Sequence, residues 1–182
     1  MMDDYSLATT SLDTPIGTLR LAASDQGLAH VLFAPDKRTL PGSPDALPVA
    51  RHHLGVALDA LKAYFASDPE PFGGVTLAPS GTVFQQKVWA ALKRIPFGET
   101  RSYRDIAIAI GNPKATRAVG LANGKNPLPI IVPCHRVIGS NGSLTGFAGG
   151  LPTKRWLLEF EGARAHRSPV HSSLCLSLQR PD

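Results

Sequence analysis

The sequence has little cysteine, few aromatic residues and no long hydrophobic run. Its 182 residues include two cysteines, Cys134 and Cys175, so neither a disulfide framework nor a multi-cysteine zinc cluster can be built. Aromatic residues make up only 7% of the chain, but 43% is hydrophobic, as in folded globular proteins. No apolar stretch approaches the ~20 residues of a membrane-spanning helix. The first four residues, Met-Met-Asp-Asp, are acidic overall and are followed by no apolar core, so we expect no secretory signal. We therefore expect a cytoplasmic protein with no membrane partner.

Positive charge is concentrated in one half of the chain. Residues 1–81 hold 5 Lys/Arg and 9 Asp/Glu, a net charge of −4, whereas residues 82–162 hold 11 and 4, a net charge of +7. Such a basic segment is typical of a protein that binds a phosphate-rich partner. A solvated basic surface without a partner fits the charge count equally well.

The amino-terminal part has the pattern of a small α/β unit. Apolar runs at 16–23 and 28–34 flank a Ser-Asp-Gln-Gly turn, which predicts a hairpin. The proline-rich residues 35–50 are expected to form an irregular loop, and the apolar spacing from Leu54 to Phe65 predicts a helix. Residues 67–81 have the composition of a linker, with a short strand expected at 75–77.

The second part has the pattern of a helical unit. Thr82 with Gln85, and Ser102 with Asp105, have the capping-box spacing that begins a helix. The first of these helices is expected to end at Pro96, and the second to span 103–110. A third helix is expected to begin with Asn112 as its cap and Pro113 as its first residue and to end near residue 124. This tight helix pair is typical of a helix-turn-helix, although many such pairs bind nothing.

The last helix is expected to run from Pro152 to Glu161, with Gly162 as its stop. Its apolar residues Trp156, Leu157 and Phe160 should face the core. Residues 163–182 show no clear periodicity, and we expect a loose tail there.

A reactive cysteine is indicated by the segment 127–137, Pro-Leu-Pro-Ile-Ile-Val-Pro-Cys-His-Arg-Val. We expect a buried strand over 128–132 that ends at Pro133 and presents Cys134 beside His135. The nearby imidazole and the positive surroundings are expected to lower the pKa of the thiol. The alternative is an inert buried cysteine next to a satisfied histidine.

Sequence neighbours rarely direct their side chains at each other, so a direct contact between Cys134 and His135 is awkward. A bridging water would let His135 take the thiol proton. The other ring nitrogen then needs an acceptor to fix its tautomer. Glu159 and Glu161 are the candidates, and the amide of Asn126 can hold the loop around Cys134.

The motif Pro133-Cys134-His135-Arg136-Val137 resembles the active-site motif of the methylated-DNA–protein-cysteine methyltransferases, the O6-alkylguanine-DNA alkyltransferases. Four further segments resemble the family in the family's order: 98–103, 111–120, 126–127 and 149–162. The match is strong over 82–162. The amino-terminal part matches in length, hairpin and placement.

The resemblance implies a role for each matching residue. Cys134 would take the alkyl group, His135 would act as the base through water, Glu161 would hold His135, Asn126 would support the loop, and Tyr103 would displace a phosphate and assist the leaving guanine. Arg117 would fill the gap left by a flipped base. The implied DNA contacts are Arg117, Thr116, Ala118, Ala115, Tyr103, Asn123 and Arg136. The implied substrate pocket comprises Pro129, Val137, Phe147, Ala148 and Gly149.

The resemblance also implies binding in the minor groove, rather than in the major groove that a helix-turn-helix usually enters. The small residues of the helix after the turn are compatible with this narrow groove. The chain departs from the family's frequent pattern at Phe147, where many relatives carry tyrosine, and at Ala148, where some carry serine. Some relatives bind zinc in the amino-terminal domain. Since this chain has no cysteine before Cys134, we expect no metal and no cofactor.

The family also implies an α+β fold of two domains. A small amino-terminal α/β domain (1–78), with a short antiparallel sheet plus helix, would be ribonuclease-H-like. A mainly helical domain (79–163) of winged helix-turn-helix type would carry the active site, followed by a flexible tail (164–182). The expected partner is double-stranded DNA containing O6-alkylguanine, with O4-alkylthymine as an open second substrate. A monomer is expected, and cooperative assembly along DNA stays open.

Three other functions compete with alkyl transfer. The alkyltransferase-like lesion sensors share the motif but carry tryptophan at the cysteine position, so Cys134 argues against a sensor. A cysteine hydrolase would turn over, and the adjacent Cys-His spacing argues against it. A plain DNA-binding regulator would not discriminate damaged from undamaged DNA.

Overall fold

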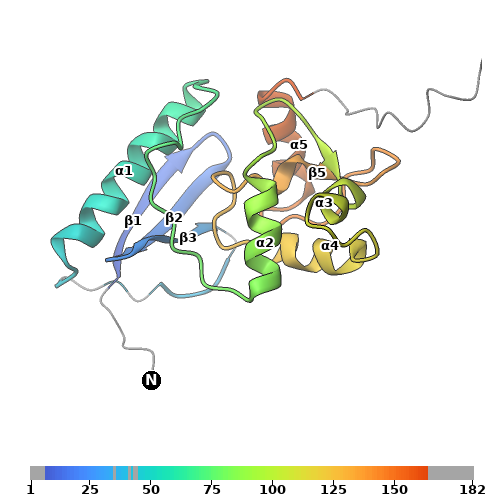
Figure 1. The fold of residues 1–182 in the computed structure, drawn as a ribbon. Helices are drawn as coiled ribbons and strands as arrows, with labels where there is room; N and C mark the ends of the chain where they lie inside the picture. Colours follow the sequence, from blue (N-terminus) through green and yellow to red (C-terminus); the bar gives the residue numbers. More distant parts are fainter. Residues whose placement is uncertain (1–6, 35, 41, 43–44, 164–182) are drawn as a thin grey trace, which may run out of the picture.

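The computed structural model describes residues 7–34, 36–40, 42 and 45–163. A sheet with one long helix forms one side of the molecule, and a group of shorter helices forms the other (Figure 1). The two sides correspond to the acidic and basic halves of the sequence. Residues 164–182, including Cys175 and most of the expected tail, lie outside the described part.

A three-stranded antiparallel sheet in the order β1-β2-β3 builds the amino-terminal side. Its strands are β1 (Ala8–Thr14), β2 (Gly17–Ser24) and β3 (Gly27–Phe33). The predicted hairpin is confirmed as β2 and β3, which pair around a turn that ends at Gly27 with φ 141°. The edge strand β1 has no counterpart in the sequence analysis, because its Thr- and Ser-rich residues alternate in burial but not in hydrophobicity.

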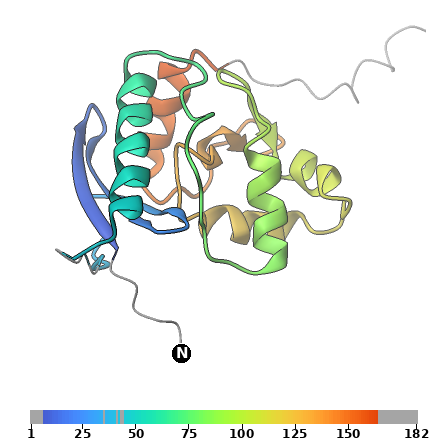
Figure 2. The same cartoon turned by 60° about the vertical axis from the view of Figure 1, so that its left-hand side comes forward.

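Helix α1 (Pro48–Phe65) packs along one face of this sheet (Figures 1 and 2). Its buried side chains, among them Leu54 and Leu61, meet the buried residues of β2 and β3 in one core. The helix starts inside the segment that we expected to be loop, because Pro48 occupies its first turn, where a missing N–H costs nothing. The expected strand at 75–77 is wrong: this segment pairs with β3 only through the isolated bridge between Leu28 and Leu77.

Three helices form most of the second side: α2 (Val83–Leu92), α3 (Tyr103–Ala109) and α4 (Thr116–Gly124). Both predicted capping boxes are present, at Thr82 and at Ser102. The expected cap at Asn112 is wrong. Residues 112–115 form a turn that the Ala115 N–H closes on the Asn112 carbonyl at 2.9 Å, so α4 begins three residues later without a side-chain cap.

The expected strand over 128–132 is also wrong. The segment is a buried tight loop, in which the Val132 N–H donates to the Leu128 carbonyl at 2.8 Å and Ile130 takes a φ of 76°. Two prolines explain the difference, because Pro129 and Pro133 have no N–H for a strand ladder. The loop leads into a 3₁₀ turn (Cys134–Arg136) and then β5 (Val137–Ile138), which pairs in parallel with β4 (Arg101–Ser102).

Helix α5 (Leu151–Phe160) is capped at its carboxyl end by Glu161, and Gly162 follows with φ 61°. As expected, Leu157 faces the core, while Trp156 and Phe160 are half-buried against it. The two sides meet at β3, where the Val31 N–H donates to the Pro127 carbonyl at 2.8 Å. They also meet at α5, where Phe160 packs against Tyr64 of α1 with ring centroids 5.5 Å apart. Among the described residues, no helix is long and apolar enough to cross a membrane.

Candidate active site

The 3₁₀ turn after Pro133 places three consecutive side chains in the interior. Cys134 is 4% exposed, His135 0% and Arg136 7%. The loop before the turn is fixed by Asn126, whose Nδ2 donates to the Val132 carbonyl at 2.7 Å and whose Oδ1 accepts from the Leu128 N–H at 3.0 Å. The loop that leads into the turn is therefore fixed before any substrate binds.

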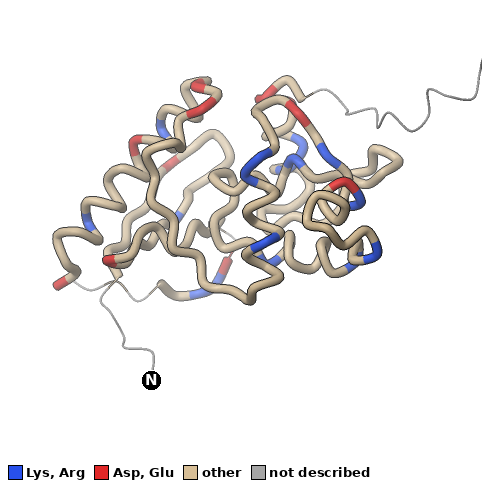
Figure 3. The backbone as a smooth tube through the Cα atoms, viewed as in Figure 1, with Lys and Arg blue, Asp and Glu red and all other residues tan. Residues whose placement is uncertain are grey.

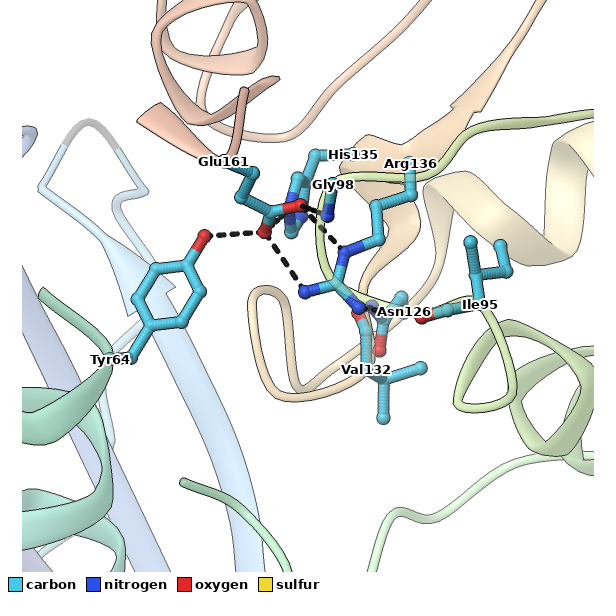
Figure 4. A network of polar contacts seen from close by, with 8 residues as sticks. All are labelled: Tyr64, Ile95, Gly98, Asn126, Val132, His135, Arg136 and Glu161. Atoms are coloured by element: carbon cyan, nitrogen blue, oxygen red, sulfur yellow. Dashed lines mark hydrogen bonds and ion pairs between the residues drawn. The ribbon is translucent and has the colours of Figure 1, made fainter. Parts of the chain in front are cut away.

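The carboxylate of Glu161 lies at the centre of a buried polar network (Figure 4). Its Oε1 is 2.7 Å from His135 Nε2, and the Arg136 guanidinium donates to both oxygens, at 2.9 Å from Nη2 and 2.8 Å from Nε. The Tyr64 hydroxyl donates to Oε1 at 2.7 Å and the Gly98 N–H to Oε2 at 3.3 Å. Of the two acceptors considered for His135, Glu161 is in contact, and Glu159 is exposed.

These contacts fix the charge and the tautomer of the pair. Burial opposes ionisation of Glu161, but the hydrogen bonds from His135 and Arg136 outweigh it and lower the pKa of the carboxyl to about 2. An ionised carboxylate can only accept, so His135 Nε2 carries a proton. Burial lowers the pKa of His135 against the pull of Glu161, so the ring is neutral and its Nδ1 is an acceptor. Within the described residues no protein atom hydrogen-bonds to that buried Nδ1.

The expected lowering of the thiol pKa is wrong. Burial raises the pKa of Cys134 to about 11, and the hydrogen bond with Asn126 and the charge of Lys154 offset only part of this effect. The resting group is a protonated thiol, which needs a base at the moment of reaction.

Lys154 was missed by the sequence analysis. It is fully buried, its Nζ donates to the carbonyls of Val137 at 2.7 Å and Thr145 at 2.8 Å, and burial lowers its pKa to about 8. The available signal was its position three residues before Leu157, on the inward face of α5. Tyr64 was missed as well, and its spacing within α1 suggests only a core aromatic side chain.

A cavity of about 580 Å³ opens between α3, α4 and the 145–148 loop. Among the expected site residues, Tyr103, Thr116, Arg117, Phe147 and Ala148 line it. Ala118 is exposed on α4 and Ala115 is partly exposed just before it. Pro129, Val137 and Gly149 are not among the lining residues, and the first two are buried.

Two expected DNA contacts are wrong. Asn123 is 3% exposed within α4, so its side chain cannot meet a groove. Arg136 is buried, and its guanidinium is occupied by Glu161 and by the Ile95 carbonyl, 2.6 Å from Nη1. The motif led us to expect that Arg136 contacts DNA. The chain turns inward here, so this arginine forms an ion pair with Glu161 instead.

Known proteins resemble this chain over both of its sides. The family model described as 6-O-methylguanine DNA methyltransferase, ribonuclease-like domain, matches residues 7–79, and its DNA binding domain matches residues 83–163. The chain belongs to this family. The α+β fold with a ribonuclease-like part and a helical part, as expected from the sequence, is confirmed.

Individual relatives cover most of the chain. A methylated-DNA–protein-cysteine methyltransferase of Methanosarcina acetivorans is 52% identical over 151 residues, which is 83% of this chain and 96% of that protein. The Mycobacterium tuberculosis protein of the same name is 49% identical and covers 85% of this chain and 92% of its own length. The crystal structure of M. tuberculosis OGT in complex with DNA matches with a TM-score of 0.74 at 49% identity, over 85% of this chain and 92% of that chain.

Proposed function

We propose that this chain repairs DNA by moving an alkyl group from O6 of guanine to Sγ of its own Cys134. A bond forms between sulfur and the alkyl carbon, the bond from that carbon to O6 breaks, and guanine leaves. The product is a thioether with no ready reversal, so each chain would act once. The observation that carries the proposal is the buried Cys134 next to a neutral His135 that is held by Glu161. The alkyltransferase relatives support it.

The thiol proton would leave through His135. Its Nε2 is committed to Glu161, so only Nδ1 can accept, and a bound water would link it to the Cys134 Sγ. The ionised Glu161 would stabilise the imidazolium that results. Because burial keeps the thiol protonated, this relay would supply the thiolate only when the alkyl carbon is in place.

The guanine would enter by flipping out of the duplex, since O6 lies inside the base stack. The cavity between α3, α4 and the 145–148 loop is the site we propose for the flipped base. Arg117 on its rim would fill the gap in the stack. Tyr103, whose hydroxyl accepts from Thr145 at 3.1 Å, would displace a phosphate and assist the leaving guanine. Thr116, Ala115 and Ala118 would approach the backbone of the minor groove.

We further propose the domain division 1–78 and 79–163 and a cytoplasmic location, where Cys134 stays reduced. The partner is duplex DNA, and Cys134 distinguishes the chain from sensors with tryptophan at this position.

Intact mass measurement tests the function directly. After incubation with duplex DNA that contains O6-methylguanine, the protein should gain one methyl group, and peptide mapping should place it on Cys134. The Cys134→Ser variant should gain nothing and still bind the duplex. Methyl gain at another residue, or multiple turnover, would refute the proposal.

A further inference from the structure

We propose that Tyr64, a residue of the amino-terminal sheet-and-helix unit, is a positioning residue for alkyl transfer that weakens the basicity of His135 through Glu161. This inference rests on the proposed function. Tyr64 lies on α1, which ends at Phe65, and Glu161 lies 97 residues later in the chain. The inference therefore extends the catalytic apparatus to a helix outside the DNA-binding part.

The argument starts from how Glu161 distributes its charge. Its two oxygens accept five hydrogen bonds, three of them on Oε1. Tyr64 OH and His135 Nε2 share that oxygen at the same distance, 2.7 Å. Each donor on Oε1 draws negative charge toward itself, so the tyrosine hydroxyl reduces the charge that His135 feels.

Tyr64 is rigidly placed for this role. It is fully buried, and its ring packs against Phe65, Phe72, Phe97 and Phe160 at centroid distances of 5.1 to 6.0 Å. Burial, together with the charge of Glu161, raises the pKa of its hydroxyl far above the ordinary value, so Tyr64 stays a donor at every working pH.

The carboxylate does not depend on Tyr64 for its location. Arg136 donates hydrogen bonds to both of its oxygens, and the Gly98 N–H donates one more to Oε2. Removing the hydroxyl should therefore leave Glu161 in place. With one donor fewer on Oε1, the carboxylate should interact more strongly with His135. The other charged groups that act on His135 are Arg136 and Lys154, and neither depends on the hydroxyl.

The test is Tyr64→Phe in the full chain, which keeps the ring and removes one oxygen. Single-turnover alkyl transfer is measured from about pH 4.5 to 8.5 with free O6-benzylguanine, so that DNA binding does not enter. We expect the acidic limb of the pH–rate profile to shift to higher pH by about half to one unit, because the protonated form of His135 gains stability. The variant is then about three- to tenfold slower on the acidic limb and within about twofold of wild type above it.

Titration of the His135 ring by NMR should show the same upward shift. The dissociation constant for duplex DNA should not change. A profile that superimposes on wild type, or a limb that moves to lower pH, overturns the inference.

Phe72→Leu is the matched control, because it loosens the packing on the Tyr64 ring, 5.6 Å away, and leaves the hydroxyl. It should lower thermal stability without moving the limb. An equal shift in this control would mean that packing, not the hydroxyl, is responsible, and would overturn the inference. Absence of methyl gain in the wild-type protein would instead overturn the proposed function.

Discussion

At the scale of single residues, the site is organised by one buried carboxylate. Glu161 neutralises Arg136, fixes the tautomer of His135 and accepts a hydrogen bond from the Tyr64 hydroxyl. Removing its charge therefore leaves these three side chains without their anionic partner. A buried cation left without its counter-ion is costly. The same carboxylate therefore links the chemistry of the site to the stability of the fold.

The Glu161→Gln variant should be less stable than wild type in a pH-dependent way. The folded pKa of Glu161 is lowered from 4.5 to about 2, so its charge stabilises the fold above pH 4.5, and this contribution is lost as the pH falls toward 2. A shift of this size corresponds to ~3 kcal/mol at neutral pH. Urea unfolding should show this difference in the free energy of unfolding between wild type and variant at pH 7. The difference should become smaller as the pH falls from about 5 to about 3. A constant difference would show that the charge contributes nothing.

At the scale of secondary-structure elements, helices α3 and α4 differ in whether a side chain caps their first turn. Ser102 accepts from the Asp105 N–H at 3.1 Å at the start of α3, whereas α4 begins at Thr116 without a side-chain cap. We expect Ser102→Ala to lower the free energy of unfolding by ~1 kcal/mol. Asn112→Ala should change it by less than ~0.5 kcal/mol. If both variants lost the same free energy of unfolding, Asn112 would be the cap of α4 after all.

The same elements show what the sequence could predict. Both capping boxes were predicted from a local signal, the spacing of residues such as Ser102 and Asp105. The β2–β3 hairpin was predicted from another local signal, two apolar runs on either side of a short turn. The 128–132 loop was mistaken for a strand because an apolar run does not distinguish a buried strand from a buried turn. The contact of Glu161 with His135 was predicted from the motif, whereas Arg136 was expected to contact DNA and instead turns inward to Glu161. Tyr64 reaches Glu161 only through tertiary packing.

Helix α4 also carries the most specific prediction about DNA. If Arg117 fills the gap left by a flipped base, Arg117→Ala should slow transfer from saturating duplex DNA strongly and transfer to free O6-benzylguanine little, since only the duplex has a stack. Single-turnover rates on both substrates measure this. Arg104→Ala, which changes an exposed cation on α3, is the control and should alter only affinity. An unchanged saturated rate for Arg117→Ala would assign this residue an ordinary phosphate contact.

At the scale of the whole molecule, charge and architecture coincide. Figure 3 shows Lys and Arg gathered over the side formed by α2 to α5, while most Asp and Glu lie over the sheet and α1. The cavity proposed for the flipped base lies on the basic side, between α3 and α4. DNA is therefore expected to bind the basic side and to leave the outer face of α1 in solvent.

This arrangement predicts a position-dependent response to salt. Binding of undamaged duplex should weaken linearly on a log–log plot against salt concentration, because each phosphate contact releases about 0.9 counter-ion. Lys114→Gln, which removes an exposed cation from the turn before α4, should reduce the slope by about one. Lys62→Gln near the end of α1, where the lysine makes an exposed ion pair with Asp59 at 3.7 Å, removes the same charge and should leave the slope unchanged. Equal reductions in both variants would mean that net charge, rather than a defined basic face, governs binding, and the proposed DNA side would then be wrong.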